Sequence, residues 1–342
     1  MKSLSLFTFL LLTTTTFFAQ ELDSIVNIGI RLHDQGQYES AIEVYKQALA
    51  IDPNSDLANY EIAMTLMSIG KLEEAIQHSE IVINQNSPFT HQAIVIKASS
   101  LDDLGKTDES IKLFESAIKK YGNDQMLCFN LGITYYRVGE IEKAIETLQK
   151  GILSDPSHAS SHLMLGLILE EQNLTVPSLF CLHFFLLLEP DSERSINAVN
   201  MINAAFGQGV SSNGENGIVI NIDSDFDKKS EWHSAEIMLP MLGALNLTAE
   251  LEKTSDIEKF KSNNSSIFRI LEESRKKKYE GIYWDFYLPF FHSLSASEHF
   301  NTYCNYAMMS TNEDAGTWTT NNPAAVESFA VWVGQELSKK ED

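Results

Sequence analysis

A cysteine and a histidine lie two residues apart inside a strongly apolar run of the sequence. The run is SLFCLHFFLLLEPD, residues 178–191, and the pair is Cys181 and His183. A thiolate beside an imidazole can act as a nucleophile with its base, and the two can also bind a metal ion. On a helix, however, side chains two positions apart do not face each other. The pattern therefore favours two structural residues over a reactive or metal-binding pair.

Three aspartates at alternate positions have the spacing of the first ligands of a calcium loop. They are Asp223, Asp225 and Asp227. The twelve-residue loop also needs glycine at its sixth position and glutamate at its twelfth. Here those positions hold Lys228 and Ser234, so the stretch is predicted to be a solvated acidic turn.

The remaining candidates for chemistry are histidines without a recognised partner spacing. Glu231 with His233, and His292 with His299, do not match the spacings of known metal sites. The sequence also contains no nucleophile elbow, HExxH motif, P-loop or dinucleotide fingerprint. We therefore predict no catalytic residue, no metal and no cofactor, and expect that the protein is not an enzyme.

Charge and cysteine content narrow the class of protein further. Lys and Arg number 25 and Asp and Glu number 47, which gives a net charge of −22. Such a chain does not bind nucleic acid or anionic lipid through a general basic surface. Cys128, Cys181 and Cys304 are far apart in mostly apolar surroundings. They are predicted to be buried thiols, with one disulfide as the alternative.

The N-terminus has the features of a secretory signal peptide. Lys2 precedes an apolar stretch over residues 4–12, and Ala19 precedes the expected cleavage site. We predict a signal peptide over residues 1–19 and export to the bacterial periplasm or cell envelope, with no membrane span after its removal. The alternative is that the segment stays uncleaved as an anchor.

Residues 22–192 repeat with a period of about 34. Four similar elements share one turn glycine, at Gly36, Gly70, Gly105 and Gly139, and a fifth copy places Asn173 at the equivalent position. If that glycine is numbered 15, position 8 is small in every copy: Gly29, Ala63, Ala98, Gly132 and Gly166. Position 20 is Ala or Ser in every copy, and proline ends three of the five. Small residues let two helices approach closely, glycine forms the turn, and proline ends the second helix.

This pattern resembles the tetratricopeptide-repeat (TPR) family, in which each repeat is a pair of antiparallel helices. Helix pairs of this kind cannot bury their apolar faces alone, so neighbouring pairs stack into a solenoid. The resemblance implies an all-α fold: a right-handed α-solenoid of about five helix pairs, followed by a mostly helical C-terminal domain. The domains are predicted as an array with a capping helix over residues 20–206, a linker over 207–217, and the C-terminal domain over 218–342.

The resemblance also implies a partner-binding groove lined by the first helix of each repeat. Arg137 is the only basic groove residue besides His33, so capture of a C-terminal carboxylate is not expected. The middle of the groove is instead rich in Tyr, Met and Phe, which make adaptable apolar contacts. The predicted groove residues are Tyr60, Met64, Met67, Phe129, Ile133, Tyr136 and Arg137. The alternative is that the protein's own C-terminal half covers this surface.

These expectations together describe an exported scaffold or adaptor that binds a protein or peptide partner. The partner segment is expected to be apolar or basic, because the repeat region is acidic. Two alternatives stay open: an envelope enzyme whose catalytic site lies in the C-terminal half and whose substrate the repeats recruit, and a self-assembling structural protein of the envelope. The oligomeric state is not predicted.

The apolar run itself becomes the second helix of the fifth repeat. It carries no charged residue between Ser178 and Leu188, whereas the second helices of the other repeats carry Glu, Lys or Gln. A helix that is apolar on all sides is a buried helix. We predict that residues 193–206 and part of the C-terminal domain cover it, and that Phe180, Phe184 and Leu187 are buried.

Overall fold

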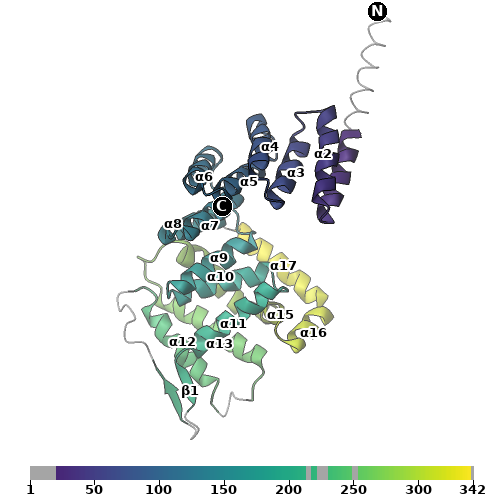
Figure 1. The fold of residues 1–342 in the computed structure, drawn as a ribbon. Coiled ribbons are helices and arrows are strands. Elements are labelled where there is room, and N and C mark those ends of the chain that lie inside the picture. The colour runs from purple at the N-terminus through teal and green to yellow at the C-terminus, as the bar shows by residue number, and fades with distance from the viewer. Residues whose placement is uncertain (1–20, 213–216, 222–229, 249–252, 340–342) are drawn as a thin grey trace, which may run out of the picture. The chain divides into compact units, whose positions relative to one another are not determined.

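The computed structural model describes residues 21–212, 217–221, 230–248 and 253–339 (Figure 1). The predicted signal peptide and the aspartates of the calcium-like stretch lie outside the described residues. The chain forms two compact units, residues 1–154 and 155–342.

The first unit consists of consecutive antiparallel helix pairs, as the period of the sequence predicts. A first helix over residues 21–34 pairs with α2, and three further pairs follow. The helices are α2 (Tyr38–Ile51), α3 (Asp56–Ser68), α4 (Leu72–Gln85), α5 (Thr90–Asp103), α6 (Thr107–Tyr121), α7 (Gln125–Arg137) and α8 (Ile141–Ser154).

The turn within each helix pair uses a left-handed residue, as the register predicts. Gly36, Gly70, Gly105 and Gly139 have φ between 73° and 81°. Asn173, which replaces the glycine in the fifth pair, has φ 58°. Asparagine is one of the few residues that adopt this conformation readily, so the fifth copy keeps the same turn.

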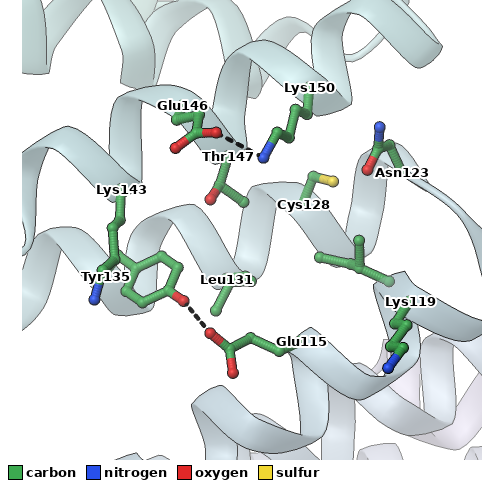
Figure 2. A pocket seen from close by; sticks show the side chains of 11 residues that line it. Glu115, Lys119, Asn123, Cys128, Leu131, Tyr135, Lys143, Glu146, Thr147 and Lys150 are labelled. Atoms are coloured by element: carbon green, nitrogen blue, oxygen red, sulfur yellow. Dashed lines mark hydrogen bonds and ion pairs between the residues drawn. The ribbon is translucent and has the colours of Figure 1, made fainter.

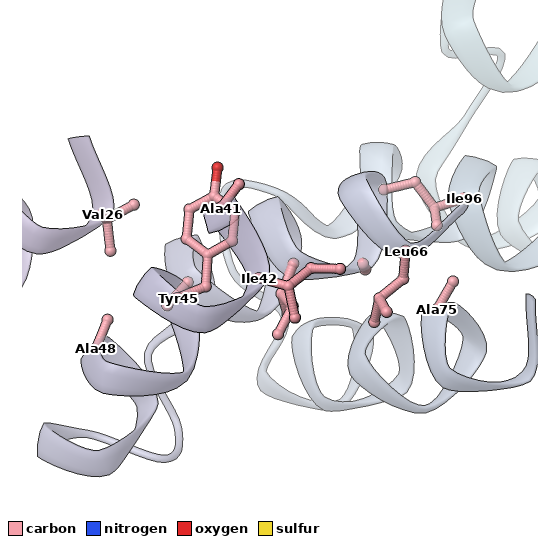
Figure 3. Packing of buried hydrophobic residues seen from close by; sticks show 11 residues of the cluster. Val26, Ala41, Ile42, Tyr45, Ala48, Leu66, Ala75 and Ile96 are labelled. Atoms are coloured by element: carbon pink, nitrogen blue, oxygen red, sulfur yellow. The ribbon is translucent and has the colours of Figure 1, made fainter. Parts of the chain in front are cut away.

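Small residues allow the helices to cross at short distance. A Cβ atom added to Gly29 would lie 2.3 Å from Cε1 of Tyr45, and Tyr45 is fully buried. Figure 3 shows Tyr45 in the core of the first two repeats, which continues through Ile42 and Leu66 to Ile96. Stacked helix pairs from the first helix to α5 thus share one apolar core.

The second unit contains the fifth helix pair together with the rest of the chain. Its elements are α9 (Ala159–Glu171), α10 (Thr175–Leu188), α11 (Glu193–Gly207), β1 (Val210–Ser212), β2 (Ile218–Ile220), α12 (His233–Leu245), α13 (Asp256–Ser274), the π-helix η1 (Tyr283–Tyr287), α14 (Leu288–Ala296), α15 (Phe300–Met308), α16 (Glu313–Asn321) and α17 (Pro323–Ser338). Over the described residues the fold is therefore all-α, apart from one small antiparallel hairpin.

The apolar helix α10 is the centre of this second unit, which confirms its predicted burial. Phe180, Phe184 and Leu187 are 1%, 0% and 9% exposed. The helix packs against α9, α11, α12, α15 and η1. Phe180 contacts the rings of Trp232, Phe268, Tyr287 and Phe291. Aromatic residues after residue 280 thus form part of this core.

Several boundaries differ from the sequence prediction. The compact units divide after Ser154, not at the linker over residues 207–217, because α10 needs the C-terminal helices to bury its apolar surface. Part of that linker forms β1, which pairs with β2. Pro289 is the second residue of α14, which directly follows the π-helix η1.

Candidate functional site

The first helices of repeats two, three and four lie side by side. Helix α5 packs against both α3 and α7. We call the exposed surface of these three helices the A-helix face. All seven predicted groove residues lie on α3 or α7, at its two flanks. Six are partly exposed and Arg137 is exposed: Tyr60, Met64, Met67, Phe129, Ile133, Tyr136 and Arg137.

On α3, the predicted residues form an apolar surface that rests on buried core residues. Tyr60, Met64 and Met67 pack against the core of the first two repeats. The Tyr60 hydroxyl donates to the sulfur of Met64, 3.9 Å away. The Tyr60 ring stacks on Phe89 with ring centroids 5.2 Å apart. This surface is therefore held in one orientation before any partner arrives.

Phe89 was missed by the sequence analysis. It is the residue just before α5, so it falls between the helical positions that the repeat register assigns to the groove. The available signal was the irregular register of the third copy, which carries an extra residue near Thr90.

On α7, the side chain of Arg137 is engaged within the unit. Its Nη1 lies 2.8 Å from Oδ2 of Asp102, a buried carboxylate on α5. Oδ1 of Asp102 accepts a hydrogen bond of 2.6 Å from the Thr107 hydroxyl. Because Arg137 is already paired, it ties α7 to α5 and is not set up as an anion clamp. Phe129, Ile133 and Tyr136 supply the apolar surface of this helix.

A pocket of about 440 Å³ lies between α6, α7 and α8 (Figure 2). Its floor includes Cys128 and Leu131, and a charged rim surrounds it. The Tyr135 hydroxyl donates to Glu115 at 2.6 Å. Burial, followed by this hydrogen bond to Glu115, raises the pKa of Tyr135. Lys143 lies over the Tyr135 ring. These side chains occupy a different side of α7 from the A-helix face, and the sequence analysis did not foresee the pocket.

The cysteine and histidine of the apolar run are separated by the fold, as their spacing predicts. Burial raises the pKa of the Cys181 thiol, which lies beside Tyr287. His183 instead lies between the Tyr303 hydroxyl, 2.6 Å from Nδ1, and Oδ1 of Asn264, 2.7 Å from Nε2. A fully buried thiol that resists ionisation is a poor nucleophile. All three cysteines are buried free thiols.

Neither a cluster of metal ligands nor a membrane-spanning helix occurs among the described residues. Within those ranges, no three or more His, Cys, Asp or Glu side chains come together as metal ligands would. His299 packs against the rings of Phe329 and Trp332. Among the same residues, no helix combines the length and the apolar character that a bilayer crossing requires.

Family models match the same part of the chain that carries the helix pairs. A model described as TPR repeat matches residues 29–70, and one described as tetratricopeptide repeat matches residues 97–150 and 129–175. The chain carries tetratricopeptide repeats. Repeats of this family form protein-interaction scaffolds and are generally not catalytic.

Curated relatives match between a third and two fifths of the chain. TPR repeat-containing protein MJ1428 of Methanocaldococcus jannaschii is 29% identical over 128 residues, which is 36% of this chain and 22% of that protein. Protein CTR9 homolog of Arabidopsis thaliana is 24% identical over 133 residues, which is 39% of this chain and 12% of that protein. The matched part of the chain thus spans less than a quarter of the length of either relative.

Solved TPR structures are also similar. A structure described as MamA is 24% identical, with a TM-score of 0.39, and the match covers 51% of this chain and 97% of that one. TTC0263, a thermophilic TPR protein of Thermus thermophilus, is 16% identical with a TM-score of 0.46, covering 53% and 98%. YrrB, described as a TPR protein with an unusual peptide-binding site, is 17% identical with a TM-score of 0.37, covering 54% and 97%.

Proposed function

We propose that this protein is an exported scaffold that holds a segment of a protein partner on the A-helix face. The observation that carries the proposal is the partly exposed apolar surface on α3 and α7. On α3, Tyr60, Met64 and Met67 pack on the core beneath them, and the Tyr60 ring stacks on Phe89. Partly exposed Tyr, Met and Phe on a rigid support are the residue types that dominate binding energy at interfaces.

The charge of the chain supports an apolar or basic partner segment. Residues 22–192 contain 24 acidic and 11 basic side chains. An acidic surface speeds the approach of a basic partner and disfavours an acidic one. Arg137, the one basic residue predicted for the groove besides His33, is paired with Asp102, so the A-helix face offers little to a partner's carboxylate.

Site-specific crosslinking tests the binding face. The photoreactive residue p-benzoylphenylalanine is placed at Met64 or Tyr136 of the full chain, in the cells that make it. We expect a crosslinked protein at both positions and none at Lys46, a well-exposed residue on α2. A partner crosslinked equally from all three positions, or from none, would contradict binding at this face.

The triple substitution Tyr60→Ala, Met64→Ala, Tyr136→Ala supplies the energetic part of the same test. Each side chain is a candidate anchor, and truncating one good anchor costs about 2 kcal/mol or more. The affinity for the partner identified by crosslinking should therefore fall at least about tenfold. Lys46→Ala is the matched control, and circular dichroism verifies that both variants fold.

The predicted export is tested by determining the first residue of the mature protein. Intact-mass measurement of protein from the envelope fraction should give a chain that begins at Gln20. Leu10→Arg places a charge in the apolar stretch of the signal and should leave the full-length chain in the cytoplasm. Envelope protein that still carries residues 1–19 would support the uncleaved anchor instead.

A further inference from the structure

The pocket between α6, α7 and α8 has an apolar floor. Cys128 and Leu131 are 0% and 3% exposed, and Ile118 adds a third apolar side chain to the lining. Burial, and then the charge of Asp124, raise the pKa of the Cys128 thiol to about 11. The thiol is therefore uncharged near neutral pH, and the floor suits the apolar part of a ligand.

The same pocket gathers positive charge within an acidic part of the chain. Residues 22–192 contain 11 basic and 24 acidic side chains. Three of these basic residues, Lys119, Lys143 and Lys150, line the pocket together with only two glutamates. The pocket thus offers an anion an attraction that most of the repeat region does not.

Lys119 is the lysine of this pocket that stays without a partner. The other two pair with neighbouring glutamates, at N–O distances of 3.3 and 2.8 Å. Glu115 precedes Lys119 by four residues on α6, a spacing at which Glu and Lys stabilise a helix by pairing. Its Oε1 instead accepts a hydrogen bond of 2.6 Å from the Tyr135 hydroxyl. Within the described residues, the Lys119 ammonium therefore has neither an ion pair nor a hydrogen bond.

A second donor lies at the same end of the pocket. Figure 2 shows Asn123 and Lys119 at one end, and Tyr135 with Lys143 at the other. The side-chain amide of Asn123 donates no hydrogen bond to any residue that the structure describes. An ammonium and an amide can both donate to one carboxylate, and the bond from the ammonium is the stronger because both groups are charged.

The pocket one repeat earlier has the same size but a different lining. It lies between α4, α5 and α6, has a volume of about 440 Å³, and is lined by three glutamates and two lysines. Lys97 on α5 pairs there with Glu80 on α4 at 2.7 Å. The residue 34 positions after Lys97 is Leu131, on the apolar floor of the later pocket. A cavity thus recurs with the repeat, whereas the excess of lysine over glutamate and the apolar floor belong to the later pocket.

We propose that the pocket between α6, α7 and α8 binds a small carboxylic acid with an apolar chain. The carboxylate accepts hydrogen bonds from the Lys119 ammonium and the Asn123 amide, and the chain lies on Ile118, Cys128 and Leu131. The volume of about 440 Å³ is typical of small-molecule sites. Because this pocket and the A-helix face lie on different sides of α7, the site does not depend on the proposed function.

Methyl NMR of the full chain, titrated with sodium hexanoate at constant ionic strength, tests this site. Ile118→Val identifies the methyl signal of Ile118, and that signal should shift saturably in the native chain. Hexanamide keeps the apolar chain without the charge, and acetate keeps the charge without the chain. Both should bind at least about tenfold more weakly than hexanoate, because each lacks one of the two contacts.

Substitution of the unpaired lysine tests which group holds the carboxylate. Lys119→Gln removes the charge at an exposed position and should raise the Kd for hexanoate about tenfold. Lys106→Gln is the matched control, because Lys106 is an exposed lysine that lines the earlier pocket, and it should leave the Kd unchanged.

Four results would overturn the site. They are an Ile118 signal that hexanoate does not shift saturably, equal affinities for hexanamide and hexanoate, a Kd that Lys119→Gln leaves unchanged, and an equal loss of affinity in Lys106→Gln. The second would mean binding by the apolar floor alone, and the fourth would mean a general effect of charge. Circular dichroism of both variants verifies that they fold like the native chain.

Discussion

A fragment that ends at residue 206, within the last turn of α11, should aggregate at concentrations where the full chain stays in solution. Removing residues 207–342 uncovers α10, whose side chains Phe180 and Phe184 contact aromatic rings from the deleted region. An aromatic side chain buries about 150–250 Å². Two of them with their aliphatic neighbours exceed the few hundred Å² of contiguous apolar surface that a monomer tolerates.

Light scattering after size-exclusion chromatography, together with binding of an apolar dye, measures this outcome. The matched control is a fragment that ends at Ser154, where the first compact unit ends. Its last helix carries Lys143, Glu146 and Lys150, all well exposed, so this fragment should stay monomeric and bind little dye. A monomeric 20–206 fragment without dye binding would show that α10 is stable without the C-terminal helices.

The repeat half of the fold was predictable because its information is local. Each helix pair carries its own turn residue and its own small crossing residues, within about 34 positions. Even the substitution of Asn173 for glycine could be read from the count alone, and its φ of 58° confirms the register. Burial of α10 was predictable for a similar reason, since the absence of charge is visible in the run itself.

The C-terminal half was less predictable because its determinants are distant in sequence. The Tyr303 hydroxyl hydrogen-bonds to His183 across 120 residues, and Tyr287 to His162 across 125. These pairings follow no repeat. The sequence therefore indicated a mostly helical domain there, but neither the β-hairpin nor the division after Ser154.

The candidate site was likewise predictable only in part. The repeat register predicted which residues of α3 and α7 occupy the A-helix face, and the structure leaves all seven at least partly exposed. Phe89 was not predicted, because it lies just before α5 and so outside the helical positions that the register assigns to the groove. Its contact with Tyr60 joins residues 29 positions apart.

The second unit should lose stability steeply below pH 6.5, because it buries two neutral histidines. His162 Nε2 lies 2.9 Å from the carbonyl oxygen of Pro156, which can only accept, so Nε2 carries the proton. Its Nδ1 then accepts from the Tyr287 hydroxyl at 2.7 Å. His183 has the same arrangement, with Asn264 as the acceptor and Tyr303 as the donor. A second proton on either ring would face a hydroxyl hydrogen and have no carboxylate to pair with.

Burial lowers the pKa of His162 to about 3 and that of His183 to about 4. The unfolded chain binds these protons near pH 6.5, while the folded chain does not. The free energy of unfolding is therefore unaffected by these histidines above pH 6.5. It decreases as the pH falls from 6.5 toward 4, because only the unfolded chain binds the two protons. Each histidine contributes about 1.4 kcal/mol per pH unit. Two histidines over two pH units amount to roughly 5 kcal/mol, which is comparable to the whole stability of a typical domain.

Tryptophan fluorescence during urea unfolding, measured from pH 7 to pH 4.5, isolates this effect. All four tryptophans lie in the second unit, and Trp232 stacks on Trp284 in its core. The double variant His162→Gln, His183→Gln should be less stable at pH 7 but should lose most of the pH slope. His292→Gln, at a partly exposed position on α14, should keep the slope of the native chain. The double variant differs from the native protein only in the two buried imidazoles. If the free energy of unfolding depends on pH equally in both proteins, carboxylates and not these histidines cause the acid sensitivity.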